Sequence, residues 1–217
     1  LHLSIRRQRQ MCIRDRGRGD ASDPGLLVGN GGAHNFRDCT LATMPIPEFI
    51  VETRKKIGTD LMWVPAVCAV VLRDATDASP WAVPEVLLVR RADNGEWTPV
   101  TGIADPGEEP HVAAVREVLE ETGVRVTAAA ILGVGAHGPV THENGDKASY
   151  MTVQLRCEPL DPTAEPVVGD DENTEAGWFP ISQMPVRDPK WRLAIADAAA
   201  QRRHPGSFAP RMGLTKR

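Results

Sequence analysis

Three glutamates lie close together in one segment, and their spacing would bring their carboxylates to one side of a helix. Residues 109–122 are rich in helix formers and are followed by Gly123, a residue type that commonly ends helices. On such a helix Glu117 and Glu121, four residues apart, stack on one face, and Glu120 lies beside them. Like charges at this spacing repel each other. Magnesium or manganese, which bind carboxylate and phosphate oxygens, would offset that repulsion.

The same helix carries apolar residues, and a further acid precedes it. Val112, Val115 and Leu119 recur at helical spacing, so we expect them to form the side that faces the core. Glu108 follows a glycine-containing turn, from which its side chain would reach back to Arg116. An ion pair between them would fix the turn against the helix and hold the glutamates in line.

Glutamates on a helix often form no more than a solvated face, and the residues around these three decide against that reading. Segment 102–124 fits the pattern G-x5-E-x7-R-E-U-x-E-E-x-G-U, in which U is aliphatic. A chance match is expected in about one of 10⁹ frames. The segment resembles the Nudix box at every fixed position: Gly102, Glu108, Arg116, Glu117, Val118, Glu120, Glu121, Gly123 and Val124.

The resemblance extends beyond the box and implies both a fold and an activity. Residues 64–191 are similar to a Nudix domain, an α/β/α sandwich around a mixed sheet. Strands that alternate with helices along this chain independently indicate an α/β or α+β domain. Nudix enzymes hydrolyse a phosphoric anhydride in a nucleoside diphosphate linked to another moiety, and the resemblance implies Mg²⁺ or Mn²⁺ as the cofactor.

The resemblance also implies which residues act. Glu117, Glu120 and Glu121 would hold the metal together with a backbone carbonyl near Thr101 or Gly102. Either Glu117 or Glu121 would orient or deprotonate the attacking water. The Glu108–Arg116 pair would keep the bracing role described above.

Two features near the box qualify this assignment. Many family members have two glycines where this chain has Thr101 and Gly102, and a β-branched Thr101 would be strained if the backbone there required a positive φ. A glutamate from a later loop often completes such a site. Glu172 is the first candidate and Glu175 the second, with a plain acidic surface loop as the alternative.

Candidates for substrate contact outside the box are Arg90, Arg91, Trp97, Trp63, Asn144 and Asp146. The arginines, or the Asn-Gly-Asp loop, would meet phosphate or ribose, although such a tripeptide is also a common plain turn. A tryptophan would stack on a base, although a single tryptophan more often belongs to a core or its rim. His137 and His142 have no partner at ligand spacing, so we do not expect them to bind metal.

Composition places most of the chain in one globular domain. The chain has 217 residues, of which 41% are hydrophobic, enough for a sizeable core. Residues 1–43 contain seven Arg and four Asp and lack any periodic apolar pattern, which is typical of a disordered or spurious leader. We expect a natural start at Met44, a single domain over residues 44–209 and a loose tail over 210–217.

The expected elements follow from apolar runs and helix signals. Strands are expected at 65–73, 85–91, 97–103, 124–134, 149–157 and 175–179, and helices at 45–58, 109–122 and 189–203. Asp188 and Pro189 form the start signal of the last helix.

Charge and cysteine content limit the partners and the location. The chain has a net charge of −4, and the part after the leader is more acidic still, so a long nucleic acid is a poor partner. The four cysteines show no zinc or redox spacing, and no apolar run is long enough to span a membrane. We expect a cytoplasmic protein that takes a small nucleotide substrate. A homodimer is an option that the sequence leaves open.

Three functions remain to be distinguished. The leading one is a pyrophosphohydrolase that acts on ADP-ribose-like or nucleoside triphosphate-like substrates. The second is a non-catalytic Nudix module that binds a nucleotide metabolite, against which the intact glutamates argue. The third, RNA processing guided by the basic leader, would be excluded if removal of residues 1–43 left activity unchanged.

Overall fold

The computed structural model describes residues 47–75, 82–142, 144–169 and 171–213. All of them belong to one compact unit, residues 40–217. The expected leader and the expected start at Met44 lie outside the described residues.

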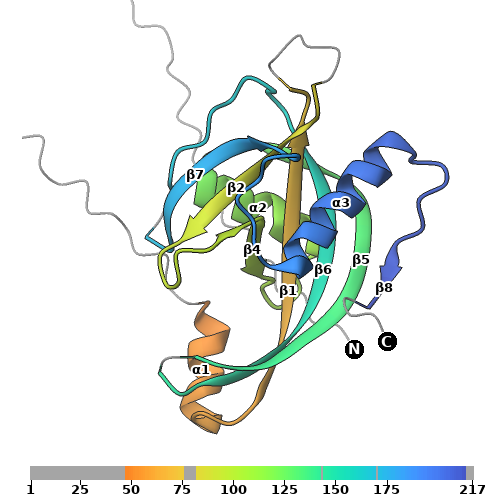
Figure 1. Ribbon diagram of the computed structural model, residues 1–217. Coiled ribbons are helices and arrows are strands. Elements are labelled where there is room, and N and C mark those ends of the chain that lie inside the picture. Colours follow the sequence, from red (N-terminus) through yellow and green to blue (C-terminus); the bar gives the residue numbers. More distant parts are fainter. Residues whose placement is uncertain (1–46, 76–81, 143, 170, 214–217) are drawn as a thin grey trace, which may run out of the picture. The chain divides into compact units, whose positions relative to one another are not determined.

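An eight-stranded mixed sheet is the centre of this unit (Figure 1). Its strands are β1 (Met62–Arg73), β2 (Glu85–Arg91), β3 (Trp97–Thr98), β4 (Val100–Ile103), β5 (Val126–Thr141), β6 (Lys147–Pro159), β7 (Asn173–Pro180) and β8 (Arg211–Met212). The order is β3-β2-β1-β6-β5-β8, with β4 paired to β1 and β7 to β2. The β1–β6 and β5–β8 pairs are parallel and the other pairs antiparallel.

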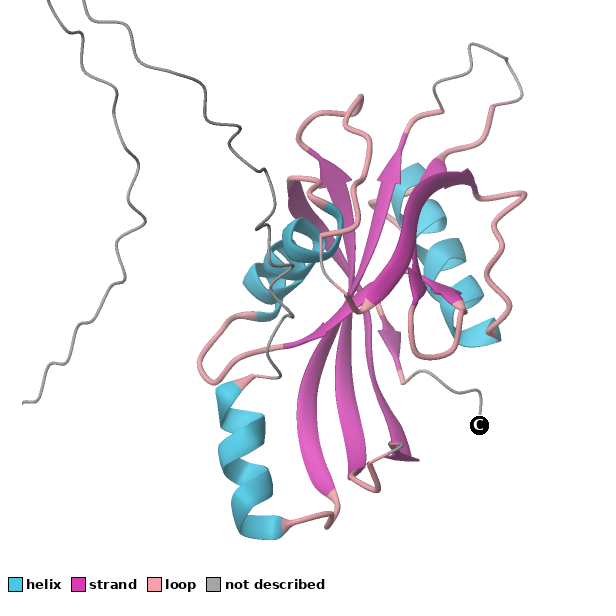
Figure 2. Ribbon diagram, turned by 90° about the vertical axis from the view of Figure 1, so that its left-hand side faces the viewer, coloured by secondary structure: helices cyan, strands magenta, loops and turns pink. Residues whose placement is uncertain are grey.

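Helices cover both faces of the sheet, which confirms the expected α/β/α architecture (Figures 1 and 2). They are α1 (Glu48–Ile57), α2 (Pro110–Thr122) and α3 (Pro189–Arg203). One apolar core lies between α2 and the sheet, and a second lies between the sheet and α3. A third, smaller cluster seats α1 beside the far end of the β5–β6 hairpin. Strand β1 packs into both large cores, so its apolar run has no polar alternation.

Pro99 divides the strand that was expected over residues 97–103. Proline has no backbone N–H to donate to a ladder, so pairing cannot continue through it. The segment before Pro99 pairs with β2 and the segment after it pairs with β1. The chain thereby changes partners immediately before the box, which leaves β4 beside β1 at the base of α2.

The structure also differs from the sequence predictions in the length of two strands and in the C-terminal tail. Strands β5 and β6 extend beyond the predicted 124–134 and 149–157 and meet in a hairpin whose turn is centred on Gly145, with a φ of 84°. In the tail, which was expected to be loose, Arg211 and Met212 pair with β5. Both oxygens of Asp197 on α3 accept hydrogen bonds from Arg211, each at 2.8 Å, which ties this strand down.

Among the described helices, none is both long enough and apolar enough to cross a membrane.

Candidate active site

The face of α2 that packs on the sheet carries carboxylates as well as apolar groups. Its buried residues are Ala113, Ala114, Glu117, Val118, Glu121 and Thr122. Val112, Val115 and Leu119 were expected to face the core. This prediction was wrong for Val112 and Leu119, which are 47% and 46% exposed. The alanines let the helix lie close to the sheet, and this close approach brings the longer Glu117 and Glu121 side chains against β4 and β7.

Glu117 rests directly on Gly102 of β4. A Cβ atom at position 102 would lie 2.0 Å from the Glu117 Cδ atom, so no other residue type fits there without moving the carboxylate. Thr101 and Gly102 both lie in the β4 ladder, opposite Cys68 and Val67 of β1. The backbone is therefore extended at this point, and the expected strain at Thr101 does not arise. Glycine is required at position 102 by close approach, not by a positive φ.

Arg116 links the turn before α2 to the glutamates, as the sequence predicted. Its guanidinium donates two hydrogen bonds to Glu108, at 3.0 and 2.9 Å, and a third, at 3.1 Å, to the Ile103 carbonyl. Its Nη1 atom also donates to Glu117 at 2.9 Å and to Glu120 at 2.8 Å. The hydrogen bond from Arg116 lowers the pKa of Glu108, which stays ionised. Arg116 therefore fixes the positions of three carboxylates at once.

Burial strongly alters the protonation of Glu117. Burial raises the pKa of Glu117 to about 7, and the positive charge of Arg116 only partly opposes this effect. The negative charges of Glu120 and Glu172 raise the pKa further. A carboxyl group that titrates near neutral pH is suited to take a proton from water.

Glu121 has a different environment, because Asn173 at the start of β7 donates a hydrogen bond to it at 2.9 Å. Both residues are buried, with 4% and 6% of their surface exposed. Asn173 is 52 residues away in sequence, and nothing in its local pattern indicated this role. Among the described residues, no three acidic, His or Cys side chains gather closely enough to hold a metal ion as they stand.

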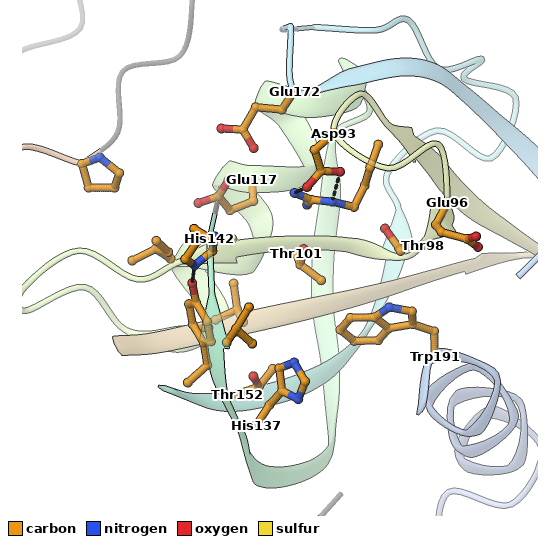
Figure 3. A pocket seen from close by; sticks show the side chains of 18 of the residues that line it. Asp93, Glu96, Thr98, Thr101, Glu117, His137, His142, Thr152, Glu172 and Trp191 are labelled. Carbon is orange, nitrogen blue, oxygen red and sulfur yellow. Dashed lines mark hydrogen bonds and ion pairs between the residues drawn. The ribbon is translucent and has the colours of Figure 1, made fainter. Parts of the chain in front are cut away.

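A large open pocket of about 1450 Å³ lies beside these residues. Gly102, Arg116, Glu117, Glu120 and Glu172 line one part of it, whereas Glu121 and Glu108 do not. In Figure 3, Glu117 and Glu172 lie at one end and Trp191, His137 and Thr152 at the other, with Thr101 between them.

The pocket is lined by residues from both faces of the sheet, because Val67 belongs to the first core while Trp97 and Trp191 pack against the second. Within the described strands, β4 has β1 as its only ladder partner. Successive residues of a strand face opposite sides. Gly102 accordingly lies on the α2 side, opposite Val67 of the first core, and Thr101 lies on the α3 side, opposite Cys68 of the second core.

Only some of the predicted substrate residues line this pocket. Arg91 and Trp97 do, and two hydrogen bonds of 3.0 and 2.7 Å hold Arg91 on Asp93. Arg90 does not, because it pairs with the other candidate Glu175 at 2.6 Å on the surface. Trp63 is 57% exposed and also lies outside the pocket.

The Asn-Gly-Asp loop forms the hairpin turn between β5 and β6. The Asn144 side chain accepts from the Asp146 backbone N–H at 3.1 Å and donates to its carboxylate at 3.0 Å, as a plain turn would. Neither residue lines the pocket. His137 and His142, which were not expected to bind metal, do line it, and His142 is hydrogen-bonded to Tyr150 at 2.8 Å.

These features define an α/β/α protein whose pocket has a carboxylate helix on one side. Comparison with known families is consistent with this class. The family model of the NUDIX domain matches residues 62–200, which is more than half of the chain. The chain therefore belongs to the Nudix hydrolase family.

Individual relatives match parts of the chain. A MutT-like protein of Streptomyces ambofaciens is 45% identical over 102 residues, which are 47% of this chain and 59% of that protein. A putative 8-oxo-dGTP diphosphatase of Bacillus subtilis (strain 168) is 48% identical over 50 residues, which are 23% of this chain and 34% of that protein. The chain thus spans less than two thirds of the length of either relative.

A solved structure shares the fold. The crystal structure of a UDP-X diphosphatase superposes with a TM-score of 0.50 at 19% identity, covering 76% of this chain and 74% of the other. At that identity the likeness concerns the arrangement of helices and strands alone.

Proposed function

We propose that the protein hydrolyses a phosphoric anhydride in a nucleoside diphosphate linked to another moiety, with Mg²⁺ or Mn²⁺ as its cofactor. The observation that carries this proposal is the buried Glu117 carboxylate, which lies against Gly102 at the wall of the pocket. The family membership supports the same reaction class. Both an ADP-ribose-like and a nucleoside triphosphate-like substrate are consistent with a pocket of this size.

The donor set suits a hard divalent cation. Carboxylates of Glu117 and Glu120 already share one positive group, the Arg116 Nη1 atom, so their oxygens can approach a common charge. The metal ligands that we propose are Glu117, Glu120 and Glu121, with Glu172 from the later loop and the Gly102 carbonyl. A bound dication would neutralise charge on the phosphate oxygens of the substrate.

The chain's own residues have distinct tasks in this proposal. Glu117, which lies at the wall of the pocket against Gly102, orients the attacking water and accepts its proton. Glu121 does not line the pocket and accepts a hydrogen bond from Asn173, so we assign the role of the base to Glu117 and not to Glu121. Arg116 and Glu108 keep the helix and the preceding turn in register, so that these carboxylates are placed before substrate arrives.

Nucleotide turnover tests the proposal directly. The full chain is incubated with ADP-ribose or with nucleoside triphosphates, with and without Mg²⁺ or Mn²⁺, and the release of AMP or pyrophosphate is followed. We expect release that depends on the dication. Nucleotide binding without any release would overturn the proposal in favour of a non-catalytic binding module.

We further propose a reducing, cytoplasmic location. Cys68 and Cys157, the two cysteines within the described residues, are unpaired and buried. Burial raises the pKa of both thiols to about 12, so they behave as small core residues.

A further inference from the structure

Lys190 stands at the end of the pocket remote from the glutamates. It is the second residue of α3, between Pro189 and Trp191, and it lines the pocket. The Lys190 Nζ atom lies 3.8 Å from the centroid of the Trp191 ring, a cation–π contact that fixes the direction of the long side chain.

Lys190 differs from the arginines around the same pocket. Arg91 pairs with Asp93, Arg116 pairs with the box glutamates, and Arg187 lies 3.8 Å from Glu96. Among the described residues, no carboxylate lies within ion-pair distance of Lys190, and no hydrogen bond of its ammonium group is present. Asp188, two residues away, uses its carboxylate to cap α3 by accepting from the Lys190 backbone N–H at 2.7 Å.

The position is unfavourable for a cation. Burial lowers the pKa of Lys190, and the charge of Asp188 opposes this only in part. The first turn of a helix carries the positive end of the helix dipole, which disfavours a positive side chain. The Lys190 charge also lowers the pKa of His137, which burial has already lowered. A partly desolvated ammonium group without a carboxylate partner is expected to have a ligand that accepts hydrogen bonds.

The surroundings indicate what kind of acceptor this ligand offers. Thr98 and Thr152, which lie on this side of the pocket, are neutral, and the acidic Glu96 and the helix-capping Asp188 also line it (Figure 3). A polyphosphate or a carboxylate would meet those two acids, and of the two cations beside them Arg187 already lies 3.8 Å from Glu96, which leaves Lys190 to offset the repulsion. A neutral ring with a keto oxygen would instead meet one strong donor, a flat aromatic wall and hydroxyl groups.

We propose that Lys190 is the residue that selects the nucleobase, by donating a hydrogen bond to a keto oxygen of a guanine-like or uracil-like base. This inference rests on the proposed function, because the anhydride must lie at the Glu117 end for the base to reach Lys190. An ammonium group can only donate. The selecting oxygen is O6 of guanine or O4 of uracil, because adenine and cytosine have an amino group at that position, which donates as Lys190 does and cannot accept from it.

Nucleoside monophosphates test base selection without any hydrolysis. The affinity of the full chain for GMP, UMP, AMP and CMP is measured by calorimetry in EDTA, for the natural sequence, for Lys190→Met and for the exposed Lys56→Met as the matched control. We expect GMP and UMP to bind about tenfold tighter than AMP and CMP, and Lys190→Met to abolish that difference. The Lys56→Met variant should keep it.

Each outcome decides the inference. The inference is overturned if Lys190→Met loses affinity equally for all four monophosphates or keeps the preference for GMP and UMP. It is also overturned if the natural sequence itself prefers AMP. The midpoint temperature of thermal unfolding is also measured. If it is the same for Lys190→Met as for the natural sequence, a general loss of structure is excluded. If the keto preference is present but no triphosphate or ADP-ribose is hydrolysed, the base site stands and the proposed hydrolase does not.

Discussion

The two ends of the pocket are built from the sequence in different ways. At the Glu117 end, Arg116, Gly102 and all of the acids except Glu172 come from the 23 contiguous residues of the box, and one guanidinium connects most of them. At the Lys190 end, His137, Thr152 and Trp191 come from three separate elements, β5, β6 and α3.

This difference suggests a division of labour. A contiguous motif can carry the anhydride chemistry from one protein to another, because its geometry depends on one turn and one helix. A wall assembled from distant elements changes whenever any of them changes, so it is the natural place for substrate choice. Substitutions at the Glu117 end should therefore affect all nucleotides alike, and substitutions at the Lys190 end should affect the choice among them.

The largest effect is expected for Glu117→Gln. The amide cannot accept the proton of water and is a weak ligand for a dication, so turnover should fall about 1000-fold for every nucleotide tested. Initial rates with several bases measure it, and circular dichroism checks that the fold survives. The control is Glu109→Gln, because Glu109 is exposed and its side chain makes no capping hydrogen bond. Turnover that stays within about twofold of the natural sequence would remove Glu117 from the chemistry.

Gly102→Ala should have the next largest effect, because the new methyl group would occupy the space of the Glu117 carboxyl group. Displacement of that group by about 1 Å should lower turnover roughly 100-fold with little change in the choice among bases. Gly206→Ala is the matched control, since a Cβ atom there meets nothing within 4 Å. If Gly102→Ala turns over normally, the position of Glu117 against β4 is irrelevant to catalysis.

The same contrast determines what the sequence could predict. The box pattern identified the acids and the Glu108–Arg116 pair, because their contacts are local to one turn and one helix. Apolar periodicity misplaced the inner face of α2, because that face carries two carboxylates and two alanines while Val112 and Leu119 face outward. Asn173 and Lys190 could not be found, since the sheet alone brings them to their places.

The pH dependence of stability tests the burial of Glu117 in the absence of metal. Its pKa in the folded state is about 7, above the ordinary 4.5, so the folded protein holds this proton more tightly than the unfolded chain does. The contribution is fully present below pH 4.5 and is lost as the pH rises through 7, which amounts to as much as about 3 kcal/mol. Urea unfolding in EDTA from pH 4.5 to 7.5 measures it.

Glu117→Gln provides the comparison in that experiment. The variant should lose less stability over this range than the natural sequence, because its amide does not titrate. If the free energy of unfolding changes with pH in the same way for both proteins, Glu117 is not desolvated. The Glu117 end would then have the electrostatics of an exposed acidic surface.

The smallest effect is expected at the other end, for Trp191→Leu. Removal of the ring eliminates the cation–π contact that fixes Lys190 and also the flat wall beside the base. The KM for guanine and uracil nucleotides should rise about fivefold with kcat unchanged, because the Glu117 end is intact. Trp63→Leu is the matched control, since Trp63 is 57% exposed and lies outside the pocket. A fall in kcat that is equal for all bases, with KM unchanged, would show that the two ends do not act separately.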